Sequence, residues 1–89
     1  MEKTLTFSGG KKLQNSYALE GRSELFVYVE DEGATLPDVF KILADEKKTK
    51  KIVYKYSEAE YVFEGYTKLV SIRDEGTAIT AMLTREEKE

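Results

Sequence analysis

Four lysines lie within five residues near the middle of the chain. They are Lys47, Lys48, Lys50 and Lys51. Their ammonium groups could neutralise the phosphates of a nucleic acid. The alternative interpretation is a solvated helix end, whose lysines also discourage pairing between sheet edges. We favour the solvated helix end, because the surrounding chain is acidic and lysine alone reads no base sequence.

Six tyrosines in 89 residues is a high content, and three of them follow these lysines closely. The three are Tyr54, Tyr56 and Tyr61. They flank a predicted four-residue hairpin loop at 57–60, which would place Tyr56 opposite Tyr61 and Tyr54 opposite Phe63. Phe63 is predicted to be a core residue. The three tyrosines could stack on bases, belong to the core, or form an exposed protein-contact surface, since tyrosine is favoured at interfaces.

Two carboxylate clusters, at 30–32 and 74–75, lie beside predicted turns. Neither has the spacing of a calcium-binding loop, so we interpret both as solvated turns rather than as an acid–base pair. The chain contains no cysteine and no histidine, which excludes disulfides, the common zinc sites and Ser–His or Cys–His nucleophile pairs. We therefore expect no catalytic residue, no cofactor and no metal site.

One stretch, 35–45, has the apolar period of an α-helix. The predicted buried stripe is Leu36, Val39, Phe40, Leu43 and Ala44. Ile42 is the one apolar residue outside it. Thr35 is placed to accept a hydrogen bond from the amide of Asp38, and Pro37 suits the first turn. These features predict a helix with one apolar face, which requires a sheet to cover.

Segments on both sides of this helix have the apolar content or alternation of β-strands. The predicted strands are 4–8, 12–20, 24–30, 51–56, 61–73 and 77–84. The segment 24–30 is apolar on both faces, so we expect it to be central and covered on both sides. Asn15 interrupts the second strand, and Gly65 predicts a bend or bulge in the fifth.

A tight turn at 75–76 is predicted before the last strand, and two registers fit the hairpin it would close. A two-residue loop sets Ile72 opposite Ile79, whereas a three-residue loop with Gly76 left-handed sets Ile72 opposite Ala78. The glycine suits the second register. We prefer the first, because it pairs apolar residues with apolar residues.

The order βββαβββ predicts an α+β fold, with a mainly antiparallel, twisted sheet of about six strands and the helix packed on it. The alternative is a small β-sandwich or a partly closed barrel plugged by the helix. Residues 1–89 are predicted to form a single domain, with 85–89 as a frayed tail. A chain of this length buries only about 60–65% of its unfolded surface, so association with other subunits would add to a marginal stability.

The segments YVFEGYTKLVSI (61–72) and ITAMLT (79–84) resemble short proteins encoded in prophages of Gram-positive bacteria. In those proteins a strand of the form YEGYTKL.SI precedes a charged turn and an alternating last strand. A helix of the form TL.D(V/L)F comes earlier. The similarity covers 35–85. It implies a structural, tail-associated role and supplies no catalytic residues.

We expect a non-enzymatic phage or prophage structural or assembly protein, a homo-oligomer that self-associates or docks to another virion protein through Tyr54, Tyr56 and Tyr61. The alternatives are a nucleic-acid-binding module using 47–51 with the tyrosines, and a regulatory protein that binds a host enzyme. The net charge of −3 disfavours nucleic acid as the partner. With no apolar run near the length of a membrane span and no signal peptide at the start, we expect the cytoplasm of the bacterial host or the virion.

Overall fold

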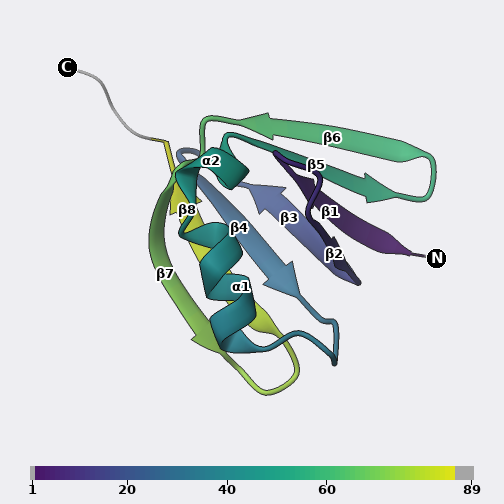
Figure 1. Cartoon of the computed structure of the whole chain (residues 1–89). Coiled ribbons are helices and arrows are strands. Elements are labelled where there is room, and N and C mark those ends of the chain that lie inside the picture. Colours follow the sequence, from purple (N-terminus) through teal and green to yellow (C-terminus); the bar gives the residue numbers. More distant parts are fainter. Residues whose placement is uncertain (1, 86–89) are drawn as a thin grey trace.

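A computed structural model describes residues 2–85 of the chain, and antiparallel strands make up most of it (Figure 1). The strands are β1 (Lys3–Phe7), β2 (Lys12–Gln14), β3 (Ser16–Glu20), β4 (Glu24–Val29), β5 (Lys51–Tyr56), β6 (Ala59–Glu64), β7 (Lys68–Asp74) and β8 (Ile79–Thr84). The helices are α1 (Leu36–Leu43) and α2 (Glu46–Thr49). The predicted α+β class and antiparallel pairing are confirmed.

The strands form two four-stranded sheets rather than one sheet of about six strands. The first sheet has the order β2-β1-β5-β6, and the second has the order β3-β4-β8-β7. The prediction of a single sheet is therefore wrong, and the arrangement corresponds to the sandwich alternative. The extra strands arise because two segments predicted as single strands each pass from one sheet to the other.

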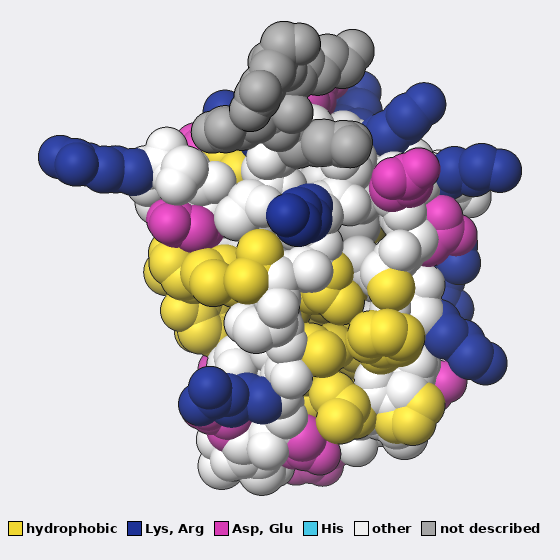
Figure 2. Space-filling model, turned by 90° about the vertical axis from the view of Figure 1, so that its left-hand side faces the viewer, with side chains coloured by type: hydrophobic (Ala, Val, Ile, Leu, Met, Phe, Trp, Pro, Cys, Tyr) yellow, Lys and Arg dark blue, Asp and Glu magenta, His cyan; other side chains and the backbone are white. Residues whose placement is uncertain are grey.

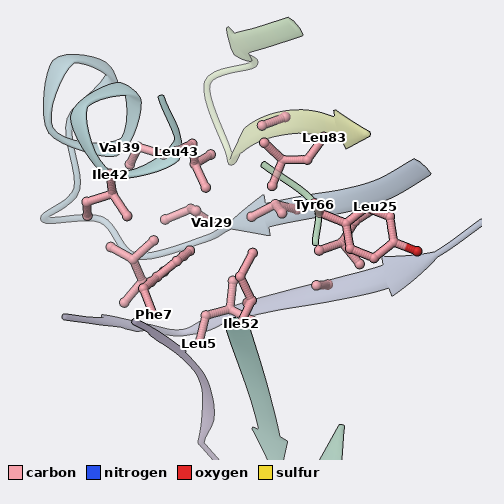
Figure 3. Packing of buried hydrophobic residues seen from close by; sticks show 14 of the residues in the cluster. Leu5, Phe7, Leu25, Val29, Val39, Ile42, Leu43, Ile52, Tyr66 and Leu83 are labelled. Atoms are coloured by element: carbon pink, nitrogen blue, oxygen red, sulfur yellow. The ribbon is translucent and has the colours of Figure 1, made fainter. Parts of the chain in front are cut away.

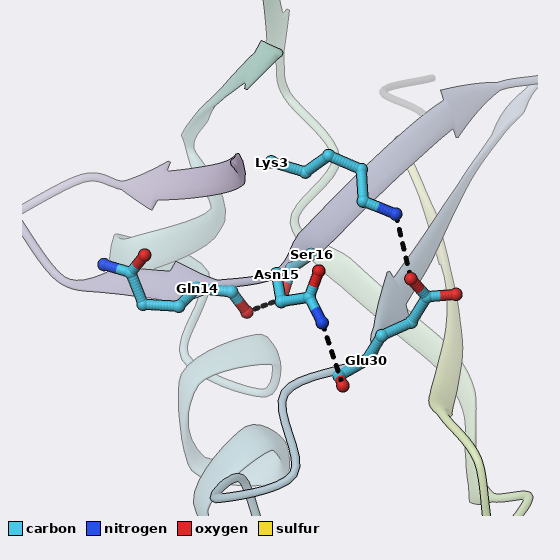
Figure 4. A network of polar contacts seen from close by, with 5 residues as sticks. All are labelled: Lys3, Gln14, Asn15, Ser16 and Glu30. Atoms are coloured by element: carbon cyan, nitrogen blue, oxygen red, sulfur yellow. Dashed lines mark hydrogen bonds and ion pairs between the residues drawn. The ribbon is translucent and has the colours of Figure 1, made fainter. Parts of the chain in front are cut away.

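The first of these crossings is at Asn15, whose φ is 49°. This left-handed conformation suits asparagine better than most residues. The Asn15 Nδ2 donates to the carbonyl oxygen of Glu30 at 3.2 Å (Figure 4). The Asn15 carbonyl accepts from the Glu30 amide at 2.9 Å. The neighbouring Ser16 hydroxyl donates to the Gln14 carbonyl at 2.8 Å. The predicted strand 12–20 is thus two strands, divided at the residue that interrupts its pattern.

The second crossing is at Gly65, whose φ is 88°. Glycine adopts this conformation at no steric cost, so the bend predicted there is confirmed. The Gly65 amide donates to the Lys50 carbonyl at 3.0 Å, which ends the pairing of β6 with β5. The next residue, Tyr66, is buried between the two sheets and donates its hydroxyl proton to the carboxylate of Glu20.

Two short helices with capped starts connect β4 to β5. Thr35 Oγ1 accepts from the Asp38 amide at 3.3 Å, which confirms the predicted cap of α1. Asp45 Oδ1 accepts from the Lys47 amide at 3.0 Å and so starts α2 inside a segment predicted to be only a charged connection. Thr49 at the end of α2 is fully buried.

Helix α1 is rotated about its axis relative to the predicted stripe. Val39, Ile42 and Leu43 are buried, whereas Phe40 is 49% exposed and Ala44 is also exposed. The predictions for Phe40, Ala44 and Ile42 are therefore wrong. The helix does not lie flat on one sheet: its buried residues point toward the core that both sheets line, close to Phe7 of β1 and Val29 of β4 (Figure 3).

The core lies between the inner faces of the two sheets and is closed by α1 (Figure 3). Its fully buried strand residues include Leu5 and Ile52 from the first sheet, and Leu25, Val27, Val29 and Leu83 from the second. Strand β4 is central, as predicted, because β3 and β8 flank it. Its other face carries Phe26 and Tyr28, which are only half-buried, so the prediction that β4 is covered on both sides is wrong.

The β5–β6 hairpin has a two-residue loop, Ser57–Glu58, in place of the predicted loop at 57–60. Tyr56 therefore pairs with Ala59, and Tyr54 pairs with Tyr61. Ser57 has a φ of 59°, and a positive φ at the first loop position matches the twist of the flanking strands. The predicted tyrosine pairing is wrong because the loop is two residues shorter than expected.

The β7–β8 hairpin follows neither predicted register. Asp74 pairs with Ile79 and Ile72 with Ala81, which leaves a four-residue loop at 75–78. The Asp74 carboxylate accepts from the Gly76 amide at 2.9 Å and stabilises this longer loop.

Figure 2 views the molecule from the side on which β7 lies, where hydrophobic side chains gather in patches bordered by charged ones.

Candidate protein-interaction surface

The loop end of the β5–β6 hairpin extends beyond the strands of the second sheet (Figure 1). Ile52 and Tyr54 are two residues apart in β5, so both lie on the core side of this hairpin. Ile52 is buried by the opposite sheet, whereas Tyr54, closer to the loop, is half-buried. Tyr54 stacks on Tyr61 with ring centroids 5.6 Å apart and planes at 22°. Tyr61 is 51% exposed, and Tyr56 is exposed at the rim.

A second stacked pair lies on the outer side of β3 and β4. Tyr17 and Tyr28 are directly opposite each other in the pairing of these strands. Their ring centroids are 4.8 Å apart and their planes are at 20°. Both side chains are half-buried, so their rings contact the protein on one side and solvent on the other.

Lys3 at the start of β1 lies beside both pairs. Its Nζ is 4.6 Å from the ring centroid of Tyr17. The same Nζ is 2.9 Å from Oε1 of Glu30 (Figure 4). The hydrogen bond to Glu30 raises the pKa of Lys3 above its ordinary value. Burial raises the pKa of Tyr54, and the nearby charge of Lys3 opposes this effect. We call Lys3, Tyr17, Tyr28, Tyr54, Tyr56 and Tyr61 the tyrosine surface.

The raised pKa values of this surface predict a loss of stability in alkali. The pKa is raised in the folded chain for Lys3 and Tyr54, and also for the buried Tyr66. Each group therefore contributes stability that is complete below its unfolded pKa of about 10 and is lost as the pH rises through the folded value. We expect the melting temperature to fall steadily above about pH 10.

Thermal melts followed by circular dichroism between pH 8 and about pH 11 test this expectation. Tyr54→Phe removes one titrating group and should make the fall shallower. Tyr56→Phe, on the same strand but at the exposed rim, is the matched control. A melting temperature that is constant or rises over this range would contradict the expected direction.

The four lysines of the alternative nucleic-acid-binding interpretation lie away from the tyrosine surface. Lys47 and Lys48 belong to α2, and Lys48 Nζ is 4.0 Å from the carboxylate of Asp45. Lys50 is exposed between α2 and β5. Lys51 is three residues from Tyr54 along β5, which places the two side chains on opposite faces of the sheet. The structure therefore does not bring the lysines and tyrosines together on one face.

The acidic clusters are used locally in turns. Asp31 Oδ1 accepts from the Gly33 amide at 2.9 Å, in the same way that Asp74 accepts from Gly76. Over residues 2–85 no three histidine, cysteine, aspartate or glutamate side chains gather closely enough to hold a metal ion.

The sequence analysis missed Lys3, Glu30, Tyr17 and Tyr28 as members or neighbours of the tyrosine surface. A signal for the two tyrosines was present. Had 12–20 and 24–30 been read as a hairpin with a four-residue connection at 21–24, Tyr17 would have been placed opposite Tyr28. Lys3 had no such signal, because its neighbours Tyr17 and Glu30 are distant in sequence.

No protein-family model, curated protein or solved structure matches this chain. The resemblance to prophage-encoded proteins therefore stays a prediction. Neither helix described between residues 2 and 85 has the length and apolar character needed to cross a membrane.

Proposed function

We propose that the protein is a non-enzymatic structural or assembly component of a phage or prophage, present in the bacterial cytoplasm or in the virion. It works by self-association or by docking to another virion protein, and the tyrosine surface makes the contact. The observation that carries this proposal is the pair of tyrosine stacks, Tyr17–Tyr28 and Tyr54–Tyr61, with Lys3 over the ring of Tyr17 and opposite Tyr56 in the pairing of β1 with β5.

Such a surface has the chemistry of a protein interface. Tyrosine offers a large rigid ring and a hydroxyl group, and it loses little conformational entropy on binding because it has few rotatable bonds. Interface cores are rich in it. The one cation at its centre, Lys3, is already neutralised by Glu30 at 2.9 Å. A nearly neutral aromatic surface favours a protein partner over a phosphate backbone, whose affinity depends on unpaired positive charge.

Sedimentation velocity on the full chain over a wide range of concentration tests the self-association. We expect the sedimentation coefficient to rise with concentration, and Tyr61→Ser to weaken the association at least about tenfold, as for a central interface aromatic. Phe40→Ser is the matched control, because Phe40 is an exposed aromatic residue of α1 outside the tyrosine surface. A wild-type chain that stays monomeric at about 1 mM would contradict self-association.

A further inference from the structure

We propose that two copies of this chain pair through β6, antiparallel about a two-fold axis that passes beside Tyr61. The first sheet of one copy then joins the first sheet of the other, and the two become one continuous sheet. This inference rests on the self-association proposed above and adds the surface, the strand and the register.

Strand β6 ends the first sheet, and β5 is the only strand paired with it among residues 2–85. Tyr56 and Ala59 flank a two-residue loop, so they exchange both of their backbone hydrogen bonds. The amide and carbonyl groups of alternate residues of β6 therefore point to β5. Those of the other residues point to the open edge. The edge-facing residues are Glu60, Val62 and Glu64.

This edge lacks most of the features that usually prevent strands from pairing between molecules. Proteins protect their edges with bulges, prolines, charged side chains (lysine above all) or very short strands. At the far edge of the second sheet, β7 has a bulge between Leu69 and Ser71 and begins with Lys68. Strand β2 has only three residues. By contrast, β6 pairs with β5 in unbroken register over six residues and contains neither proline nor lysine, so its only charged residues are Glu60 and Glu64.

Two symmetric registers would join the edge groups of two copies, and the structure favours one. If Val62 lay on the axis, Glu60 of each copy would lie opposite Glu64 of the other copy. Two pairs of like charges would then face each other, which is destabilising. The Glu64 carbonyl is moreover already an acceptor, for Arg85 Nε at 3.2 Å. With Tyr61 on the axis, Glu60 of each copy exchanges both hydrogen bonds with Val62 of the other, and Glu64 is not needed.

The side chains support the same register. Tyr61 would lie opposite Tyr61 of the second copy in a non-hydrogen-bonded pair, where Cβ atoms approach to about 4.5–5.5 Å. The Tyr54–Tyr61 stack would then continue across the axis into the same stack of the other copy. Val62, which is 47% exposed, would be covered on the opposite face. Glu60 already has a cation, Lys55, at 3.5 Å.

Cysteine cross-linking tests the register directly, because the natural chain contains no cysteine. In a non-hydrogen-bonded pair the two Cα atoms are close enough for a disulfide. We expect Tyr61→Cys to give a disulfide-linked dimer on mild oxidation. Val62→Cys is the matched control and should stay unlinked. In this register Val62 lies opposite Glu60 of the second copy, and the two Val62 residues are only diagonal neighbours. Linkage at 62 and not at 61 would overturn the register.

A proline in the edge tests the strand. Val62→Pro removes an amide that points to the open edge, so the intramolecular pairing with β5 keeps its hydrogen bonds. Val62→Thr keeps the amide and is the control. We expect Val62→Pro to raise the dimer dissociation constant at least about tenfold and Val62→Thr to leave it near the wild-type value.

These outcomes separate the inference from the proposed function. If the wild-type chain associates, but Val62→Pro associates equally well and Tyr61→Cys gives no linked dimer, the β6 interface is wrong and self-association through another surface stands. If the wild-type chain is monomeric throughout, both self-association and the β6 interface are wrong. Unchanged circular dichroism of Val62→Pro excludes a folding defect, and the cysteine variants decide the question without it.

Discussion

Replacing Leu43 by alanine is expected to lower the free energy of unfolding by about 2–5 kcal/mol. Leu43 is completely buried at the end of α1, where residues of both sheets and the helix meet. Alanine would leave a cavity that the surrounding strands cannot fill, because their backbones are held by the sheet hydrogen bonds. Since a small domain is stable by only about 5–15 kcal/mol, this loss is a large part of the total.

Phe40→Ala is the matched comparison, because Phe40 is larger than Leu43 and lies only one turn away on the same helix. Its side chain is 49% exposed, so we expect a loss of about 1 kcal/mol or less. Urea denaturation followed by circular dichroism gives both values. A loss for Phe40→Ala equal to or above that for Leu43→Ala would restore the stripe predicted from the sequence and contradict the observed rotation of α1.

Tyr66→Ala is expected to cost about 3–5 kcal/mol, the usual range for a buried aromatic residue. Tyr66 is 1% exposed and lies where the chain returns from the first sheet to the second. Its hydroxyl donates to Glu20, and the guanidinium of Arg85 lies 4.5 Å from the centre of its ring. Arg85 is also 3.7 Å from the Glu20 carboxylate, so the three side chains form one connected group.

Tyr66→Phe separates the packing of the ring from the hydrogen bond of the hydroxyl. The ring stays, and Glu20 keeps solvent and Arg85 as partners, so we expect a loss of only about 1 kcal/mol. Thermal and urea denaturation of both variants measure the difference. Equal losses for the two variants would mean that the hydroxyl, and not burial of the ring, accounts for most of the stabilisation.

Helix α1 and most strand segments could be predicted from the sequence, but α2, the lengths of two hairpin loops and the assembly of the strands could not. The Thr35 cap and the bend at Gly65 depend on chemistry within a few residues. The division of the chain into two sheets depends on which strand Asn15 and Gly65 lead into, and nothing near either residue specifies that. The exposure of Phe40 has the same origin, because the orientation of α1 follows from two sheets meeting rather than from its own period.

The candidate site divides in the same way. Tyr54, Tyr56 and Tyr61 were candidates because they flank the predicted hairpin loop, and the assumed loop length shifted their predicted pairing by two residues. The 85–89 tail is predicted to be frayed; Arg85 contacts Tyr66, and 86–89 lie outside the described residues. Lys3 could not be assigned to the tyrosine surface, because its position beside Tyr17 depends on how the two sheets meet.

The position of β8 has a consequence for biosynthesis. This strand is the last one described, yet it lies between β4 and β7 in the interior of its sheet. Until β8 has emerged from the ribosome, the edge of β4 that pairs with β8 has no hydrogen-bond partner. Strand β7 likewise has no neighbouring strand to pair with. The second sheet can therefore be completed only after Thr84 has left the exit tunnel, although β3 and β4 can pair earlier.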